Sequence, residues 1–185
     1  SDIHRFEFGP FIPPKDPNQE IGLGHEVSGV VVGKGEKVTK FQIGDKVLVE
    51  PGVPDGTCGY CREGRYNICP DVDFMATQPT YRGALCQYMV HPEEWVYPVP
   101  PQMSMVEAAL VEPASVGMHA ARLGGATLGS HIVILGGGTI GLMTLQACRS
   151  FGATDITVVD VIPSKLELAK KLGAKEVLNG KEMDI

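Results

Sequence analysis

A run of glycines has the spacing that nucleotide binding requires. Gly136, Gly138 and Gly141 fit the pattern G-x-G-x-x-G and directly follow the apolar run 131–135. In this motif the first glycine forms the turn, the second lets a pyrophosphate reach the backbone, and the third lets the helix pack on the strand. Further on, Asp160 ends a second apolar run, and a carboxylate there can accept hydrogen bonds from ribose hydroxyls. Strand, glycines, helix, strand and terminal acid together predict a dinucleotide site. A glycine-rich turn in another parallel-sheet protein is the alternative.

A cluster of cysteines has the spacing of metal ligands. Cys58, Cys61 and Cys69 lie within twelve residues of one another. Three thiolates in one loop can bind a tetrahedral zinc ion, with Zn–S distances of about 2.3 Å. Asp55 lies three residues before Cys58 and could be the fourth ligand. Because four protein ligands leave no open position, this zinc would be structural and not catalytic. A cysteine loop without metal is the alternative.

A third group is sparser. His25 is followed by Glu26, and Glu112 lies far downstream. A lone His-Glu pair is more often found at a surface than in a metal site, so these residues alone define no site.

The first half of the chain has the pattern of a β-rich domain. Glycine, proline and other turn residues separate short β-type runs. Strands are expected at 27–32, 46–50, 85–90 and 95–99. An alanine-rich helical segment follows, with Ser104 as its N-cap and Glu107 completing a capping box. Pro113 should divide that segment into two helices.

The second half has the alternating pattern of an α/β domain. The expected order is strand 131–135, helix 139–151, strand 156–160, helix 164–172 and strand 176–178. A doubly wound sheet usually has six strands, and this segment supplies two and the start of a third. We therefore predict a mixed β and α/β fold, with a first domain at 1–103 and a second at 104–185, in a piece of a longer enzyme that lacks both ends.

The amino-acid composition argues against several classes of function. The 185 residues are 43% apolar and 21% charged, as in ordinary globular proteins, and the net charge of −6 disfavours a nucleic-acid partner. No apolar run approaches the about 20 residues that span a bilayer, and the first residues do not resemble a signal peptide. Five cysteines, three of them clustered, indicate reduced thiols in the cytoplasm. Cys86 and Cys148 are expected to be buried in a strand and a helix, and His91, His119 and His131 to be structural.

The chain resembles the zinc-dependent medium-chain dehydrogenases, in the branch that oxidises polyols such as sorbitol, xylitol and butanediol. The resemblance covers almost the whole chain, and several motifs occur in the family's order. They are Ser1 to His4, Gly24-His25-Glu26-Val-Ser-Gly29, Gly44-Asp45-Lys-Val, Glu50-Pro-Gly-Val-Pro54, Gly64-Arg-Tyr-Asn-Ile-Cys-Pro70, Ala109 to His119 and the glycine loop.

The resemblance implies a partial GroES-like catalytic domain followed by the first part of a Rossmann NAD-binding domain. It implies that His25 binds a catalytic zinc ion, together with Glu26 or Glu112, either of which could instead hydrogen-bond the zinc's water. The cysteine ligand of the family would precede Ser1. The structural zinc loop carries Asp55 where the family has a cysteine, and some members lack this zinc.

The resemblance also implies roles in proton transfer and substrate contact. An open zinc position lowers the pKa of the substrate alcohol, and hydride then passes to the nicotinamide. Ser1 and His4 occupy the positions of the hydroxyl and histidine that relay the proton. Arg5 stands where the polyol branch commonly has a tyrosine that contacts the substrate.

On the cofactor side, the resemblance assigns Ile140 and the three glycines to the pyrophosphate loop, Asp160 to the ribose and Lys165 to the adenosine. No arginine follows Asp160 to hold a 2′-phosphate, so NAD is expected over NADP.

The expected function is oxidation of a polyol or secondary alcohol to a ketone, by an enzyme that family members suggest is a dimer or tetramer. Threonine 3-dehydrogenase or phosphorylated-polyol dehydrogenase of the same superfamily is the first alternative. An inactive, zinc-stabilised fragment that acts as a binding or assembly module is the second.

Overall fold

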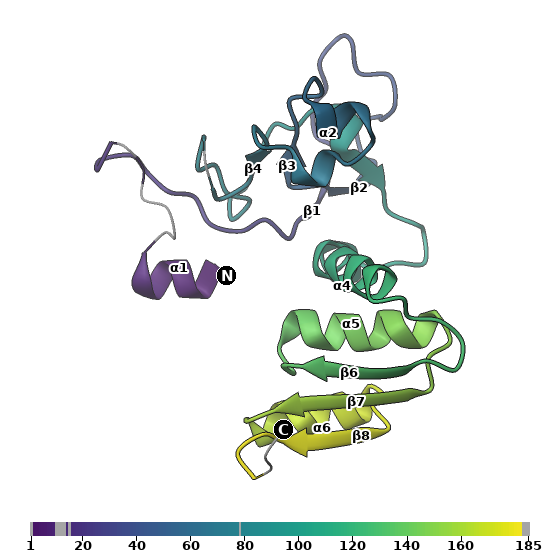
Figure 1. The fold of residues 1–185 in the computed structure, drawn as a ribbon. Coiled ribbons are helices and arrows are strands. Elements are labelled where there is room, and N and C mark those ends of the chain that lie inside the picture. The colour runs from purple at the N-terminus through teal and green to yellow at the C-terminus, as the bar shows by residue number, and fades with distance from the viewer. Residues whose placement is uncertain (1, 10–13, 15, 78, 183–185) are drawn as a thin grey trace. The chain divides into compact units, whose positions relative to one another are not determined.

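The computed structural model describes residues 2–9, 14, 16–77 and 79–182 (Figure 1). The chain forms two compact units, residues 1–110 and 111–185. Helix α3 (Met105–Ala109) belongs to the first unit, because it packs on strands β1 and β2 of that unit. Ser28 Oγ also donates a hydrogen bond of 2.6 Å to the carbonyl of Met105.

The first unit is built on short antiparallel strands. Strands β1 (Ser28–Val30), β2 (Lys46–Val49) and β5 (Val96–Pro98) form a three-stranded sheet in the order β1-β2-β5. Strands β3 (Gly52–Val53) and β4 (Asp73–Phe74) form a second pair. The other elements are α1 (Asp2–Phe8), α2 (Gly59–Arg62) and the 3₁₀ helices η1 (Tyr66–Ile68) and η2 (Glu93–Trp95). The core consists of Phe41, Val47, Val49, Met75 and Val96. Three of the four predicted strands are present.

The predicted strand at 85–90 is wrong. This segment is irregular, and Val90 is 97% exposed. The Leu85 N–H instead donates to the carbonyl of Leu23 at 2.8 Å, and no strand among the described residues pairs with the segment. Apolar alternation alone cannot form a strand that has no partner ladder. Cys86, expected to be buried there, is exposed, whereas Cys148 is buried as predicted.

The helical segment is divided as predicted. Ser104 Oγ accepts the Glu107 N–H at 3.2 Å, and the Glu107 carboxylate accepts the Ser104 N–H at 2.8 Å, which completes the capping box before α3. Helix α4 (Val111–Leu123) follows, with Pro113 in its first turn. A proline ring clashes with the carbonyl four residues earlier, here that of Ala109, so one continuous helix is excluded.

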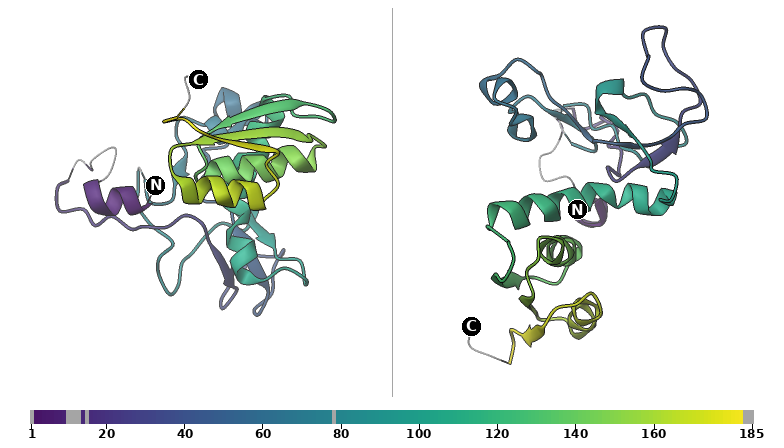
Figure 2. Two further views of the ribbon diagram at one scale, coloured as in Figure 1. Left: turned by 90° about the horizontal axis from the view of Figure 1, so that it is seen from below. Right: turned by 90° about the vertical axis from the view of Figure 1, so that its right-hand side faces the viewer.

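The second unit is the start of a doubly wound sheet. Strands β6 (His131–Leu135), β7 (Asp155–Asp160) and β8 (Glu176–Asn179) are parallel, in the order β6-β7-β8. Helices α5 (Thr139–Ser150) and α6 (Pro163–Lys171) lie on one face of this sheet (Figure 2).

The core of this unit lies between the sheet and its helices, and α4 packs against α5. Its most deeply buried side chains include Leu145, Cys148, Ile156 and Val158. The predicted βαβαβ order is confirmed, with every element boundary within one residue of that expected.

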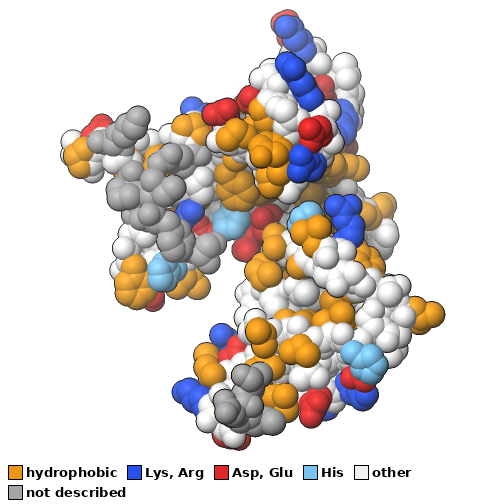
Figure 3. Space-filling view, viewed as in Figure 1, with side chains coloured by type: hydrophobic (Ala, Val, Ile, Leu, Met, Phe, Trp, Pro, Cys, Tyr) orange, Lys and Arg blue, Asp and Glu red, His pale blue; other side chains and the backbone are white. Residues whose placement is uncertain are grey.

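Each unit also exposes apolar and charged groups. Val133 and Leu135 of β6 are 63% and 76% exposed, on the face opposite the helices. On the face seen in Figure 3, Lys and Arg side chains are interspersed with Asp and Glu. Among the described residues, no helix is both long and apolar enough to cross a bilayer.

Candidate active site

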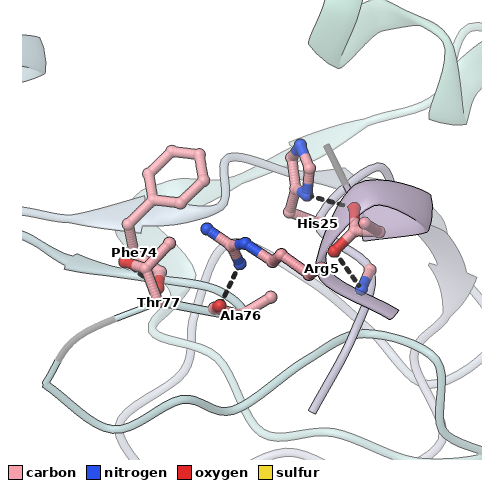
Figure 4. A network of polar contacts seen from close by, with 7 residues as sticks. Arg5, His25, Phe74, Ala76 and Thr77 are labelled. Carbon is pink, nitrogen blue, oxygen red and sulfur yellow. Dashed lines mark hydrogen bonds and ion pairs between the residues drawn. The ribbon is translucent and has the colours of Figure 1, made fainter. Parts of the chain in front are cut away.

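His25 lies beside a carboxylate from α1. Asp2 Oδ2 lies 2.8 Å from His25 Nδ1, and Asp2 Oδ1 accepts the Gly24 N–H at 3.1 Å (Figure 4). The His25 contact has the distance of an ion pair, but not the angle of a hydrogen bond. Histidines that bind metals through one ring nitrogen usually pair the other with a carboxylate or carbonyl. The arrangement therefore leaves Nε2 of His25 as the nitrogen suited to a metal.

Asp2, which contacts His25, has no role in the predictions made from the sequence. It belongs to the segment Ser1 to His4, in which the resemblance assigns Ser1 and His4 to the proton relay. A chemical argument could have identified Asp2, because a metal-binding histidine usually pairs its other ring nitrogen with a carboxylate or carbonyl.

The other predicted residues of the zinc site are placed as follows. Glu26 is exposed and follows His25 directly. Glu112 lies in the first turn of α4, in the second unit, so its participation with His25 stays a prediction. His4 is exposed on α1, with its ring 4.7 Å from that of Phe8. Ser1 lies outside the described residues.

The structure brings the four predicted ligands of the structural zinc together. One donor atom from each of Asp55, Cys58, Cys61 and Cys69 lies within 4.8 Å of all the others. Asp55 Oδ1 is 3.3 Å from Cys61 Sγ and 3.5 Å from Cys69 Sγ, and the sulfurs of Cys58 and Cys61 are 3.5 Å apart. Cys58 is the N-cap of α2, Cys61 lies within α2, and Cys69 follows η1. A set of three thiols and one carboxylate at these separations fits a tetrahedral zinc ion.

The pKa values of Asp55 and Cys61 are shifted in opposite directions in this loop. Hydrogen bonds from the backbone N–H groups of Thr57 and Cys58 hold the pKa of Asp55 well below its usual range. The pKa of the Cys61 thiol is raised to about 12, first by loss of solvent and then by its contacts with Cys58 and Asp55. A bound dication would reverse the shift at the thiol, because coordination to a metal deprotonates cysteine.

The glycine loop has the backbone geometry that the motif requires. Gly136 has a φ of +104°, and its N–H donates to the carbonyl of Val159 at 2.7 Å. A Cβ on Gly141 would lie 1.9 Å from the carbonyl oxygen of Gly136, so no larger residue fits there. A Cβ on Gly138, the N-cap of α5, would meet nothing within 4 Å. The loop therefore leaves open space at the N-terminus of α5, where a pyrophosphate could approach the backbone.

Asp160 links this loop to the end of β7. Its Oδ2 accepts the Gly137 N–H at 2.6 Å, and its Oδ1 accepts the N–H groups of Val161 and Ile162 at 2.7 and 2.9 Å. These bonds, that of Gly137 above all, hold the pKa of Asp160 below its usual value. Lys165 Nζ lies 3.9 Å from the same carboxylate. The predicted ribose ligand is thus an ionised group that also orders the glycine loop.

Ile140 lies in the first turn of α5 and is 43% exposed. The second unit thus brings every predicted cofactor residue to the glycine loop or to the adjoining ends of β7 and α6. The fit of these residues to a dinucleotide rests on the open space at Gly138 and the ionised carboxylate of Asp160.

A separate pocket lies in the first unit. Its volume is about 820 Å³, and its polar lining side chains include Asp73, Thr80, Arg82 and His91. No predicted metal or cofactor residue lines it. It is therefore distinct from both candidate metal sites.

Two glycines of the nucleotide loop are expected to respond differently to alanine. Gly141→Ala should destabilise the protein by about 2 kcal/mol or more, because its Cβ overlaps the Gly136 carbonyl. Gly138→Ala should leave stability nearly unchanged and weaken dinucleotide binding by about tenfold or more, because its methyl group stands where the pyrophosphate would approach. Denaturant unfolding and calorimetric NAD titration of the whole protein measure the two effects. Equal stability of the two variants would contradict this account.

Family models match most of the chain. The alcohol dehydrogenase GroES-like domain matches residues 1–101, and the zinc-binding dehydrogenase domain matches residues 139–185. An uncharacterized zinc-type alcohol dehydrogenase-like protein of Escherichia coli is 63% identical over all of this chain and 53% of its own length. A sorbitol dehydrogenase of Bacillus subtilis is 48% identical over 88% of this chain and 46% of its own. The chain thus spans about half the length of the curated relatives it matches.

Solved structures of oxidoreductases are also similar to this chain. An Escherichia coli oxidoreductase of unknown specificity has a TM-score of 0.95 and 62% identity, over 99% of this chain and 53% of its own. A galactitol-1-phosphate dehydrogenase of Escherichia coli has a TM-score of 0.82 and 36% identity, over 89% of this chain and 47% of its own. A zinc-binding dehydrogenase of Sinorhizobium meliloti, bound to NADP, has a TM-score of 0.89 and 29% identity, over 100% of this chain and 52% of its own.

These matches confirm the expected fold, a GroES-like domain followed by the start of a Rossmann sheet. The chain belongs to the zinc-binding alcohol dehydrogenase family.

Proposed function

We propose that the whole protein oxidises a polyol or another secondary alcohol to a ketone, with NAD as hydride acceptor and a catalytic zinc ion. The observation that carries this proposal is the contact between Asp2 and His25, which suits Nε2 of His25 to a metal in a chain of this family. When bound, zinc would lower the pKa of the substrate hydroxyl and NAD would accept the hydride.

The residues of this chain would have the following roles in zinc binding and proton transfer. His25 would bind the metal, with Asp2 fixing its ring, and Glu26 or Glu112 would supply a carboxylate to the metal or to its water. His4, which is exposed on α1, would pass the proton to solvent together with Ser1. Asp55, Cys58, Cys61 and Cys69 would hold a second, structural zinc.

We propose NAD over NADP. The Asp160 carboxylate is ionised, and its negative charge would repel a 2′-phosphate. The residue after it is Val161, which offers no cation. Gly136, Gly138, Gly141 and Ile140 would surround the pyrophosphate, and Lys165 would lie near the adenosine. Because a relative of 29% identity binds NADP, the preference needs a direct test.

We place the protein in the cytoplasm, where the zinc-binding thiols stay reduced, and propose that it is a dimer or tetramer. A phosphorylated polyol is the second candidate substrate, since a solved relative is a galactitol-1-phosphate dehydrogenase.

Formation of NADH by the whole protein from a panel of polyols, polyol phosphates, diols and threonine tests the proposal. We expect NADH from at least one polyol or polyol phosphate, with kcat/KM for NAD at least about tenfold above that for NADP, because the carboxylate of Asp160 opposes the 2′-phosphate. No reduction of either cofactor by any compound would contradict the proposal. Activity with threonine alone would show that the substrate is an amino alcohol and not a polyol.

A further inference from the structure

We propose that Cys58 and Cys61 are a modification site, at which a peroxide forms a reversible disulfide that prevents the loop 55–69 from binding zinc. The inference adds control by oxidation to the proposed function, and its zinc part rests on the proposed structural site. Disulfides of cytoplasmic proteins are usually transient and often sense oxidants, so such a bond is compatible with the compartment proposed above.

The two sulfurs lie close enough to bond. Cys58 is the N-cap of α2 and Cys61 lies within this helix, and their Sγ atoms are 3.5 Å apart. A disulfide has an S–S distance of about 2.05 Å, so a relative shift of about 1.5 Å between the sulfurs forms the bond. The Cys61 N–H donates to Cys58 Sγ at 3.4 Å, so the Cys58 side chain already points toward Cys61.

The structure favours this pair over other cysteines. Cys58 and Cys61 are half-buried, whereas Cys69 is only 4% exposed. Cys86 is exposed but lies outside the cluster. The fourth member of the cluster is Asp55, whose carboxylate forms no disulfide. Oxidation of the loop is therefore expected to give one defined product.

The reaction is a two-electron oxidation of the cysteine pair, with a peroxide as the oxidant. One cysteine sulfur attacks a peroxide oxygen, the O–O bond breaks, and a sulfenic acid and water form. The sulfur of the other cysteine then displaces the sulfenic hydroxyl group, which leaves as water with the proton of that thiol. The two sulfurs thus lose the two electrons that reduce hydrogen peroxide to two waters. A dithiol reductant restores both thiols by thiol–disulfide exchange.

The disulfide and a zinc ion compete for the same two sulfurs. Zinc binds thiolates, and the oxidised loop would keep only Asp55 and Cys69 of its four ligands. The disulfide closes a ring between residues three apart, and such a short ring stabilises the chain less than a long one. It would not connect Asp55 to Cys69, which carries the only buried side chain of this loop. The oxidised loop should therefore lose most of the stabilisation that zinc would provide.

Treatment of the whole protein with hydrogen peroxide tests the inference, with and without prior removal of zinc by a chelator. After removal of zinc, mass spectrometry of proteolytic peptides should find Cys58 bonded to Cys61, and dithiothreitol should restore both thiols. The oxidised protein should bind one zinc ion fewer per subunit than the reduced protein. Zinc-loaded protein should form the disulfide at least about tenfold more slowly, because the metal then occupies both sulfurs.

Three variants make the result specific. Cys61→Ser removes one sulfur and should leave Cys58 without a disulfide partner in the loop. Cys86→Ser changes an exposed cysteine outside the cluster and should behave as the wild type does. Asp55→Asn keeps both sulfurs and should form the disulfide although its zinc binding is weakened. This third variant keeps the test decisive where Cys61→Ser does not fold.

The outcomes that would overturn the inference are separate from the dehydrogenase assay. Absence of the Cys58–Cys61 disulfide from zinc-depleted wild type and from Asp55→Asn would overturn it. Equal zinc content of the reduced and oxidised proteins, or equal rates of oxidation with and without zinc, would overturn the competition with the metal. None of these measurements uses NADH formation, so a protein that reduces no cofactor would contradict the proposed function and leave this inference standing.

Discussion

Replacing His25 by alanine is expected to lower kcat/KM with alcohol and NAD by about a thousandfold or more in the whole protein. Loss of a zinc ligand removes Lewis-acid stabilisation of several kcal/mol, and about 1.4 kcal/mol corresponds to a factor of ten in rate. Steady-state NADH formation measures the loss, and mass spectrometry of the metal content should show one zinc fewer per subunit.

Two further variants make this result specific. Asp2→Asn should lower activity by about 10- to 100-fold, because it removes the carboxylate that fixes the His25 ring and leaves the ligand itself in place. His131→Ala is the matched control, since this histidine is 83% exposed at the start of β6 and should be dispensable. A His25→Ala enzyme that kept a tenth of the wild-type activity would refute the assignment of His25 as a zinc ligand.

Removal of the proposed structural zinc is expected to have the second large effect, on stability. Cys61→Ser should cost about 4 kcal/mol in the free energy of unfolding, because the loop 55–69 has no buried side chain except that of Cys69 and would depend on the metal for its folding. Denaturant unfolding with and without a chelator measures the difference. Chelation should destabilise the wild type and leave Cys61→Ser almost unchanged.

The same loop offers two controls. Cys86→Ser changes an exposed cysteine outside the cluster and should alter neither zinc content nor stability. Asp55→Asn keeps an oxygen that can accept the N–H groups of Thr57 and Cys58, but removes the charged metal ligand. It should therefore weaken zinc binding more than it disturbs the loop. Full zinc retention in both Cys61→Ser and Asp55→Asn would exclude this cluster as a zinc site.

The parts of the fold that the sequence predicts are those specified by local patterns. The second unit follows from apolar runs of period two and 3.6 around the glycines, and the capping box at Ser104 and Glu107 needs only four consecutive residues. The break before Pro113 follows from the covalent geometry of proline. The cysteine cluster is also local, since one loop carries all four ligands.

The parts that could not be predicted depend on distant contacts. The segment 85–90 has a strand-like composition, but a strand requires a partner that a pattern does not reveal. Arg5 and Ala76 are 71 residues apart in sequence, and only the folded chain shows that they meet. Asp2 and His25 lie in different elements as well. Asp2, which contacts His25, is therefore a residue that the sequence left unassigned.

Zinc dependence of NAD reduction is the most direct test of the central claim. The whole protein is depleted of zinc with a chelator and then titrated with Zn²⁺, while NADH formation from the best substrate of the panel is followed. We predict that activity disappears on depletion and returns in proportion to the added zinc, while the His25→Ala variant stays inactive throughout. Undiminished NADH formation by protein with less than about 0.1 zinc per subunit would contradict the proposed catalytic role of zinc.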